Sequence, residues 1–127
     1  MTTKFTPEHQ WIKLIDGSAH MALVGITEHA QETLGDIVFV SLPKVGEVLT
    51  QNTVVSEVES VKAASDVFAP VSGQVTEVNA SIVDDPGLIN KDPMGEAWFF
   101  AMRIDASTDL DQLLSLEQYH KSIGKLI

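Results

Sequence analysis

The pattern of apolar and polar positions predicts a chain built mainly from β-strands. Residues 11–15 and 20–24 alternate, and Asp16-Gly17 between them is typical of a two-residue hairpin turn. The apolar run at 37–42 is typical of a buried strand. Residues 98–104 alternate most regularly. This places four large side chains on one face: Trp98, Phe100, Met102 and Ile104.

Helices are predicted in two shorter segments. Thr27 is a suitable N-cap for a helix that ends before Gly35. A second helix, over about 108–121, is predicted from a capping-type start at Thr108 and from leucines at helical spacing.

Two segments show neither pattern, and no linker divides the chain. We expect the first six residues to form a loose arm and the polar segment 81–90, which contains Pro and Gly, to form a loop. The sequence therefore predicts a single domain.

An internal repeat organises the middle of the chain. Residues 43–48 and 70–75 share the pattern P-x-x-G-x-V, and each copy leads into a β-rich stretch, at 54–61 and 75–78. This arrangement predicts two half-sheets related by an approximate two-fold axis.

Composition and charge exclude several classes of function. The 127 residues carry a net charge of −10, which disfavours binding to nucleic acid or to anionic lipid. No apolar run is long enough to span a membrane, and the N-terminus does not resemble a targeting signal. The absence of cysteine excludes disulfides and thiolate chemistry. We expect an acidic cytoplasmic domain.

Lys62 is the single basic residue between Val45 and Asn90, and it falls between the two copies of the repeat. The joining segment should turn near Lys62, because small residues such as Ala63 and Ala64 follow it. An exposed turn suits a lysine that carries a covalent arm. On spacing alone, however, an ordinary solvated lysine that forms weak ion pairs is the more common case.

Two long segments resemble the glycine cleavage system H-protein family. Residues 59–73 (ESVKAASDVFAPVSG) resemble its lipoyl-attachment segment, and residues 25–43 resemble its other long signature. Shorter matches at 86–90 and 92–98, together with the leucine-rich end, extend the resemblance from Phe5 to Tyr119.

The resemblance implies a barrel-sandwich hybrid fold. This fold is mainly β, with two antiparallel sheets and short flanking helices, including a C-terminal one. The whole of 1–127 would form one lipoyl-bearing domain, with a lipoyl-type core at about 20–104 and the C-terminal helix at about 108–121.

The resemblance also implies a non-catalytic carrier with lipoate joined by an amide to Lys62. Its partners would be the P protein (a pyridoxal-phosphate glycine decarboxylase), the T protein (aminomethyltransferase) and the L protein (dihydrolipoyl dehydrogenase). The lipoyl arm would take the aminomethyl group of glycine from P to T and pass electrons to L.

In the family, the lipoate-attaching enzymes are associated with residues that match Glu59 and Gly46 here. A glycine at position 46 also suits a turn that needs a positive φ.

The family shields its loaded arm in a cleft, using the glutamate of a His-Glu-Trp stretch and an aspartate that matches Asp66. Here that glutamate is replaced by Gln10, which has no charge to attract an amine. We expect either weaker protection of the loaded arm or substitution by another acid, such as Glu8. The family's Glu-Gly-Trp is also altered, with Ala97 in place of glycine.

The sequence also allows functions other than that of a glycine cleavage carrier. A protein that relays lipoate or octanoate to other enzymes would need the same lysine. A biotin carrier is disfavoured, because Val61 and Ala63 stand where methionines would flank the lysine. An unmodified β-rich binding module leaves both signatures unexplained. The four histidines show no spacing typical of a metal site.

Overall fold

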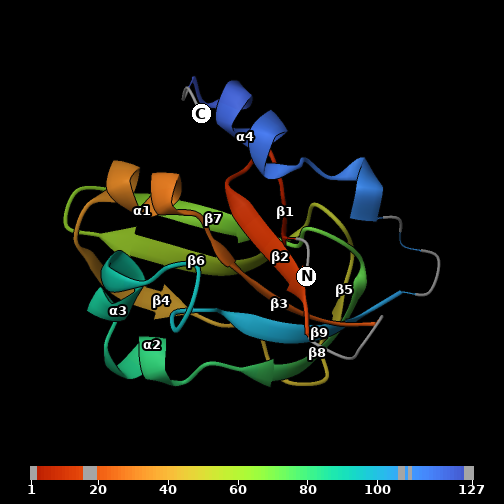
Figure 1. The fold of residues 1–127 in the computed structure, drawn as a ribbon. Helices are drawn as coiled ribbons and strands as arrows, with labels where there is room; N and C mark the ends of the chain where they lie inside the picture. Colours follow the sequence, from red (N-terminus) through yellow and green to blue (C-terminus); the bar gives the residue numbers. More distant parts are fainter. Residues whose placement is uncertain (1–2, 16–19, 106–107, 109, 125–127) are drawn as a thin grey trace.

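The computed structural model describes residues 3–15, 20–105, 108 and 110–124, which form two antiparallel sheets (Figure 1). The six-stranded sheet has the order β1(Thr3–Phe5), β2(Gln10–Leu14), β3(Met21–Ile26), β9(Phe100–Ile104), β8(Gly73–Val78), β5(Val48–Leu49). The three-stranded sheet has the order β4(Ile37–Ser41), β6(Val54–Ser60), β7(Ala64–Phe68). This architecture confirms the predicted fold class, mainly β with short flanking helices.

The main hydrophobic core lies between the two sheets and draws side chains from both. Val24, Phe100 and Met102 contribute from the larger sheet, and Val40 and Val58 from the smaller one. Each of these side chains is almost fully removed from solvent, so burial of apolar surface holds the sheets together. No helix among the described residues is long and apolar enough to cross a membrane.

The N-terminal segment differs from the expected loose arm. Residues 3–5 form β1, which pairs with β2, because Phe5 buries its ring and exchanges two backbone hydrogen bonds with Leu114.

The register of the first hairpin differs from the prediction. Leu14 pairs with Ala22, whereas a two-residue turn at Asp16-Gly17 would place Ile15 opposite Ser18. The connection is therefore longer, and residues 16–19 lie outside the described part of the chain.

The first helix agrees closely with its sequence signals. Helix α1 covers Glu28–Leu34, Thr27 accepts a hydrogen bond from the Ala30 N–H, and Gly35 ends the helix at φ 81°. Strand β4, which follows α1, is less buried than its run of apolar residues indicates. A bulge between Ile37 and Phe39 leaves the side chain of Phe39 half exposed.

The two copies of the repeat lie side by side as the β5–β8 pair. Val48 is paired with Gln74, and the Val75 N–H donates to the Glu47 carbonyl, so the pairing is symmetric about a point between the copies. The sheets themselves are unequal, with six strands and three, and are therefore not two equivalent halves.

The polar segment 81–90 is not a loop. It forms most of two short helices, α2(Ser81–Asp84) and α3(Gly87–Lys91), because Ile82 and Ile89 are fully buried and anchor one turn each. Strand β9 is also shorter than predicted, since it begins at Phe100. Trp98 packs instead against a second cluster of Phe5, Trp11 and Tyr119.

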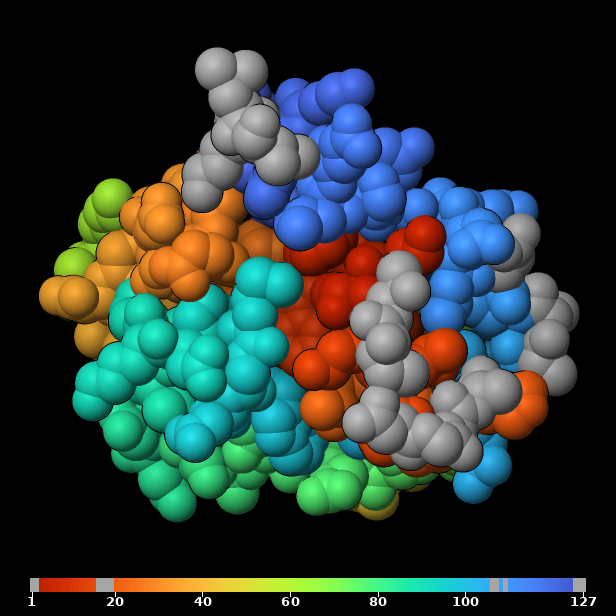
Figure 2. All heavy atoms as spheres, viewed as in Figure 1, coloured from red at the N-terminus to blue at the C-terminus, as the bar shows by residue number. Residues whose placement is uncertain are grey.

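The C-terminal segment contains two helices where one was predicted. A 3-10 helix η1 covers Leu110–Gln112, and α4 covers Leu116–Ser122 with a capping box between Ser115 and Gln118. Asp109, in the expected capping sequence, lies outside the described residues. Figure 2 shows α4 seated over the N-terminal strands and beside α1.

Candidate functional site

Lys62 lies at the tip of the β6–β7 hairpin, as its position between the repeats predicts. The Ser60 N–H donates to the Ala63 carbonyl at 2.7 Å, which leaves Val61 and Lys62 as the tip. The Ser60 hydroxyl also accepts hydrogen bonds from the backbone N–H groups of Lys62 and Ala63. The turn is therefore rigidly held while the Lys62 residue itself is exposed.

The stem of Lys62 lies over the end of helix α1. A β-carbon placed on Gly35 would lie 3.5 Å from Lys62 Cε and 4.0 Å from Nζ. The missing side chain at Gly35 thus leaves room for the lysine stem. The stem thus lies over the end of α1, and Leu34 of this helix lines the neighbouring cleft.

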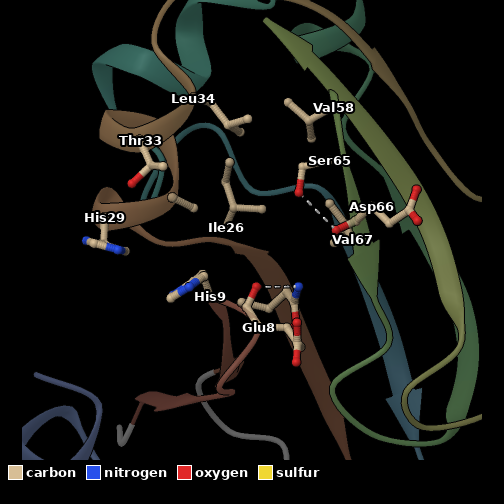
Figure 3. A pocket seen from close by; sticks show the side chains of 12 residues that line it. Glu8, His9, Ile26, His29, Thr33, Leu34, Val58, Ser65, Asp66 and Val67 are labelled. Atoms are coloured by element: carbon tan, nitrogen blue, oxygen red, sulfur yellow. Dashed lines mark hydrogen bonds between the residues drawn. The ribbon is translucent and has the colours of Figure 1, made fainter. Parts of the chain in front are cut away.

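The cleft has a volume of about 140 Å³ and runs between α1 and the three-stranded sheet (Figure 3). Its apolar lining comes from both walls: Ile26, Ala30, Leu34, Val58 and Val67. Its polar residues come mainly from the connection between β1 and β2 and from α1 and β7: Glu8, His9, Gln10, His29, Thr33, Ser65 and Asp66. Such a cleft fits a chain-like ligand with an apolar stem and a polar end.

Gln10 lies at the cleft, and both polar atoms of its side chain form hydrogen bonds within the protein. Its side chain is 1% exposed. Its Oε1 accepts from the Thr6 hydroxyl at 2.7 Å, and its Nε2 donates to the Glu8 carbonyl at 2.9 Å. Glu8 also lines the cleft and is exposed, so an acid is present beside the amide.

Asp66 lines the cleft with its backbone, whereas its carboxylate points away from it (Figure 3). Side chains alternate along β7, so Ser65 and Val67 face inward and Asp66 faces outward. The Asp66 carbonyl lies 3.4 Å from the Ser65 hydroxyl and is the group that this residue offers to the cleft. Asp66 thus lines the cleft, as the resemblance implies, but through its backbone and not through its carboxylate.

The two expected recognition residues are far apart. Glu59 is on β6 next to the tip, opposite Ala64, and is partly buried. Gly46 precedes β5, which lies at the opposite end of the molecule from the tip (Figure 1). Gly46 has φ 91°, so its turn has the positive φ that favours glycine. Ala97, in contrast, has no positive φ and is buried.

A group of polar side chains that sequence analysis missed borders the same cleft. His9 Nδ1 lies 2.8 Å from the Tyr119 hydroxyl, and this hydroxyl lies 2.7 Å from Thr27 Oγ1. The ring of His29 is centred 4.9 Å from that of His9. These residues are distant in sequence, and His9 has the unusual φ of 71°, so no local signal could have brought them together.

Burial lowers the pKa of His9, the neighbouring His29 lowers it further, and Glu8 partly opposes this. Burial raises the pKa of the Tyr119 hydroxyl, although its hydrogen bond with Thr27 opposes that shift. The His9–Tyr119 contact is therefore one between an imidazole held toward its neutral form and an un-ionised phenol.

The arrangement fits a covalent arm on Lys62. No three His, Asp or Glu side chains among the described residues are placed to hold a metal ion. A lipoyl group on Lys62 would begin over Gly35 and find an apolar wall at Leu34 and Val58. The residues present therefore fit this group.

Comparison with known proteins gives a consistent result. The family model described as "Glycine cleavage H-protein" matches residues 3–126. A "Glycine cleavage system H protein" of Psychrobacter cryohalolentis is 48% identical over 120 residues, which is 94% of each chain. One of Thermotoga maritima is 48% identical over 118 residues, which is 93% of each chain.

A solved structure agrees with the fold. The crystal structure of a glycine cleavage system H protein from Mycobacterium marinum superposes with a TM-score of 0.87 at 41% identity, over 97% of both chains.

Proposed function

Because the chain belongs to the glycine cleavage H-protein family, we propose that it carries lipoate as an amide on Lys62. The observation that carries this proposal is the placement of Lys62. It is exposed at a rigid hairpin tip, and its stem lies over Gly35 beside an apolar cleft. A rigid scaffold with one flexible arm is what a carrier needs in order to visit several enzymes.

The proposed role is that of a non-catalytic shuttle in the cytoplasm. Lipoate, when bound, supplies a disulfide that accepts the aminomethyl group of glycine and its electrons. Lys62 positions this group for the P protein, the T protein and the L protein in turn. Amide formation removes the lysine charge and makes the net charge of −10 more negative, which favours partners with basic surfaces.

The protein's own part would be to shelter the arm between visits. Ile26, Leu34, Val58 and Val67 exclude water from its stem. At the far end, Glu8 provides a carboxylate beside Gln10, whose amide is already occupied by Thr6 and by the Glu8 carbonyl. We therefore assign the attraction of a cationic amine to Glu8, and we assign the backbone carbonyl of Asp66 as an acceptor.

The lipoate-attaching enzymes would recognise Glu59 directly, since it lies on the strand that leads to the tip. The positive φ of Gly46 and its distance from the tip favour an indirect role, in which this glycine keeps the β4–β5 turn in shape.

The test is the intact mass of protein from its native host, with peptide mapping around Lys62. One lipoyl amide on Lys62 is expected, and Lys62→Arg, which keeps the charge, should carry none. An octanoyl group at Lys62 would favour the alternative function, a relay that donates lipoate or octanoate to other enzymes. Unmodified protein, from cells that lipoylate their 2-oxo acid dehydrogenases, would contradict both.

A further inference from the structure

Three side chains form a continuous chain of hydrogen bonds at one end of the cleft. Thr27 caps α1, Tyr119 comes from α4, and His9 lies in the connection between β1 and β2. The Tyr119 hydroxyl lies 2.7 Å from Thr27 Oγ1 and 2.8 Å from His9 Nδ1. The Ala30 N–H donates to Thr27 Oγ1 at 3.2 Å and completes the chain.

The number of hydrogens in this chain determines the form of His9. Three links join Ala30, Thr27, Tyr119 and His9, and each link uses one hydrogen. The Ala30 N–H, the Thr27 hydroxyl and the Tyr119 hydroxyl supply these three if His9 Nδ1 is an acceptor.

A hydrogen on His9 Nδ1 would add a fourth to the same three links. One hydroxyl hydrogen would then have no acceptor, because the structure gives Thr27 and Tyr119 no further side-chain acceptor among the described residues. Thr27 and Tyr119 are 1% and 2% exposed, so a hydroxyl hydrogen left without a protein acceptor there would cost free energy. Both the imidazolium and the neutral tautomer with hydrogen on Nδ1 are therefore disfavoured.

We propose that Thr27 and Tyr119 are positioning residues that hold His9 as the neutral tautomer with its hydrogen on Nε2. The His9 ring then adds no positive charge to the cleft. The consequence for the carrier rests on the function proposed above: an imidazolium at His9 would repel the cationic amino end of a loaded arm, and the neutral ring does not.

Some of the groups around His9 favour its neutral ring, and others favour its protonated ring. Its burial and His29, on α1, favour the neutral ring, whereas Glu8 favours the cation. Tyr119 remains a hydroxyl, since burial raises its pKa. His120, on α4, contacts the far side of this group, with its ring centred 6.4 Å from that of Tyr119. The electrostatic surroundings thus already favour neutral His9, and the hydrogen-bond chain favours it further.

The test is nitrogen-15 NMR of the imidazole rings in the unmodified full-length protein at neutral pH, with His9→Asn used to assign the signals. For His9 we expect Nδ1 at the shift of an unprotonated nitrogen and Nε2 at the shift of an N–H. A hydrogen on Nδ1, or a rapid mixture of tautomers, would overturn the proposal, and this result needs only the wild-type protein.

Three variants test the role of the hydroxyls. Tyr119→Phe keeps the ring that stacks on Phe5 at 5.0 Å but removes the donor to His9. We expect it to raise the His9 pKa by roughly 0.5–1 unit and to produce a mixture of tautomers. Thr27→Ser should retain the wild-type tautomer. Thr33→Val removes a cleft hydroxyl outside the chain and should shift neither quantity.

An unchanged His9 pKa in folded Tyr119→Phe would also refute the positioning role. Lipoylation of Lys62 is measured separately, from the intact mass of the protein. A protein without lipoate but with the expected His9 tautomer would therefore count against the proposed function and not against this proposal.

Discussion

Glu57 and Asp66 face each other across the β6–β7 ladder on the outer surface of the three-stranded sheet. Directly opposed residues on an antiparallel pair lie on the same face, and two like charges there destabilise the sheet. Their inward neighbours, Val58 and Ser65, line the cleft instead. The Asp66 carboxylate therefore belongs to the surface and not to the cleft.

Asp66→Asn should consequently stabilise the protein. Removing one of the opposed charges should raise the free energy of unfolding by about 0.2–1 kcal/mol in urea titrations at low salt. The same change in a Glu57→Gln background should give little further gain. Retention of the aminomethyl group by the lipoylated protein should be unchanged in Asp66→Asn; faster loss would mean that the carboxylate reaches the cleft.

Gly46 and Gly73 hold the same place in the repeat for different physical reasons. Gly46 has φ 91° and open space where a β-carbon would lie, so Gly46→Ala should cost about 1–2 kcal/mol through backbone strain alone. At Gly73 a β-carbon would overlap the Arg103 carbonyl oxygen, so the strands must separate. Gly73→Ala should therefore be the more destabilising change in urea unfolding. Equal losses would contradict this assignment.

Residues close together in the sequence were enough to predict α1 and the hairpin tip at Lys62. The cap at Thr27 and the stop at Gly35 define α1, and the tip at Lys62 follows from its place between the repeats. The copies of the repeat do pair. The sequence could not predict how that pairing continues, because the second copy leads on to α2 and α3, where Ile82 and Ile89 are drawn into the core.

Contacts between residues far apart in the sequence explain why the C-terminal helix was predicted wrongly. Leu113 and Leu114 have helical spacing, but the Phe5–Leu114 bridge takes up Leu114, so the helix begins later, at Leu116. The same limit applies to the site. The position of Lys62 at a hairpin tip could be predicted from its place between the repeats, whereas the His9–Tyr119 contact joins residues 110 positions apart.

His9 should make the stability of the protein depend on pH. Because the pKa of His9 is lowered in the folded state, the unfolded chain binds a proton more readily. The stabilisation is complete above the unfolded pKa of about 6.5 and is lost as pH falls from there through the lower folded pKa. His9→Asn keeps a residue that tolerates φ 71° and should flatten this dependence between about pH 7.5 and 5.5. If the free energy of unfolding in urea depended on pH equally in wild type and His9→Asn, this prediction would be refuted.

Gln10→Glu restores the acid of the related family but should disturb the folded protein. Gln10 Nε2 donates to the Glu8 carbonyl at 2.9 Å, and a carboxylate cannot donate, so two acceptors would face each other in a buried site. We expect a loss of about 1–3 kcal/mol at neutral pH. Burial beside the Glu8 carbonyl should raise the folded pKa of the new carboxyl, although the Thr6 hydroxyl would still donate to one of its oxygens. The difference from wild type should therefore shrink as pH falls through that pKa, because protonation restores a donor.

The same variant tests which acid attracts the loaded arm. If the amide at position 10 weakens protection, the aminomethyl group should persist longer on lipoylated Gln10→Glu than on wild type, because a charge attracts the amine. Gln31→Glu is the matched control, since Gln31 is also buried but does not line the cleft. Equal lifetimes in Gln10→Glu and wild type, with faster loss in Glu8→Gln, would assign the attraction to Glu8 alone. A shorter lifetime in Gln10→Glu would show that the Gln10–Glu8 hydrogen bond itself shapes the shelter.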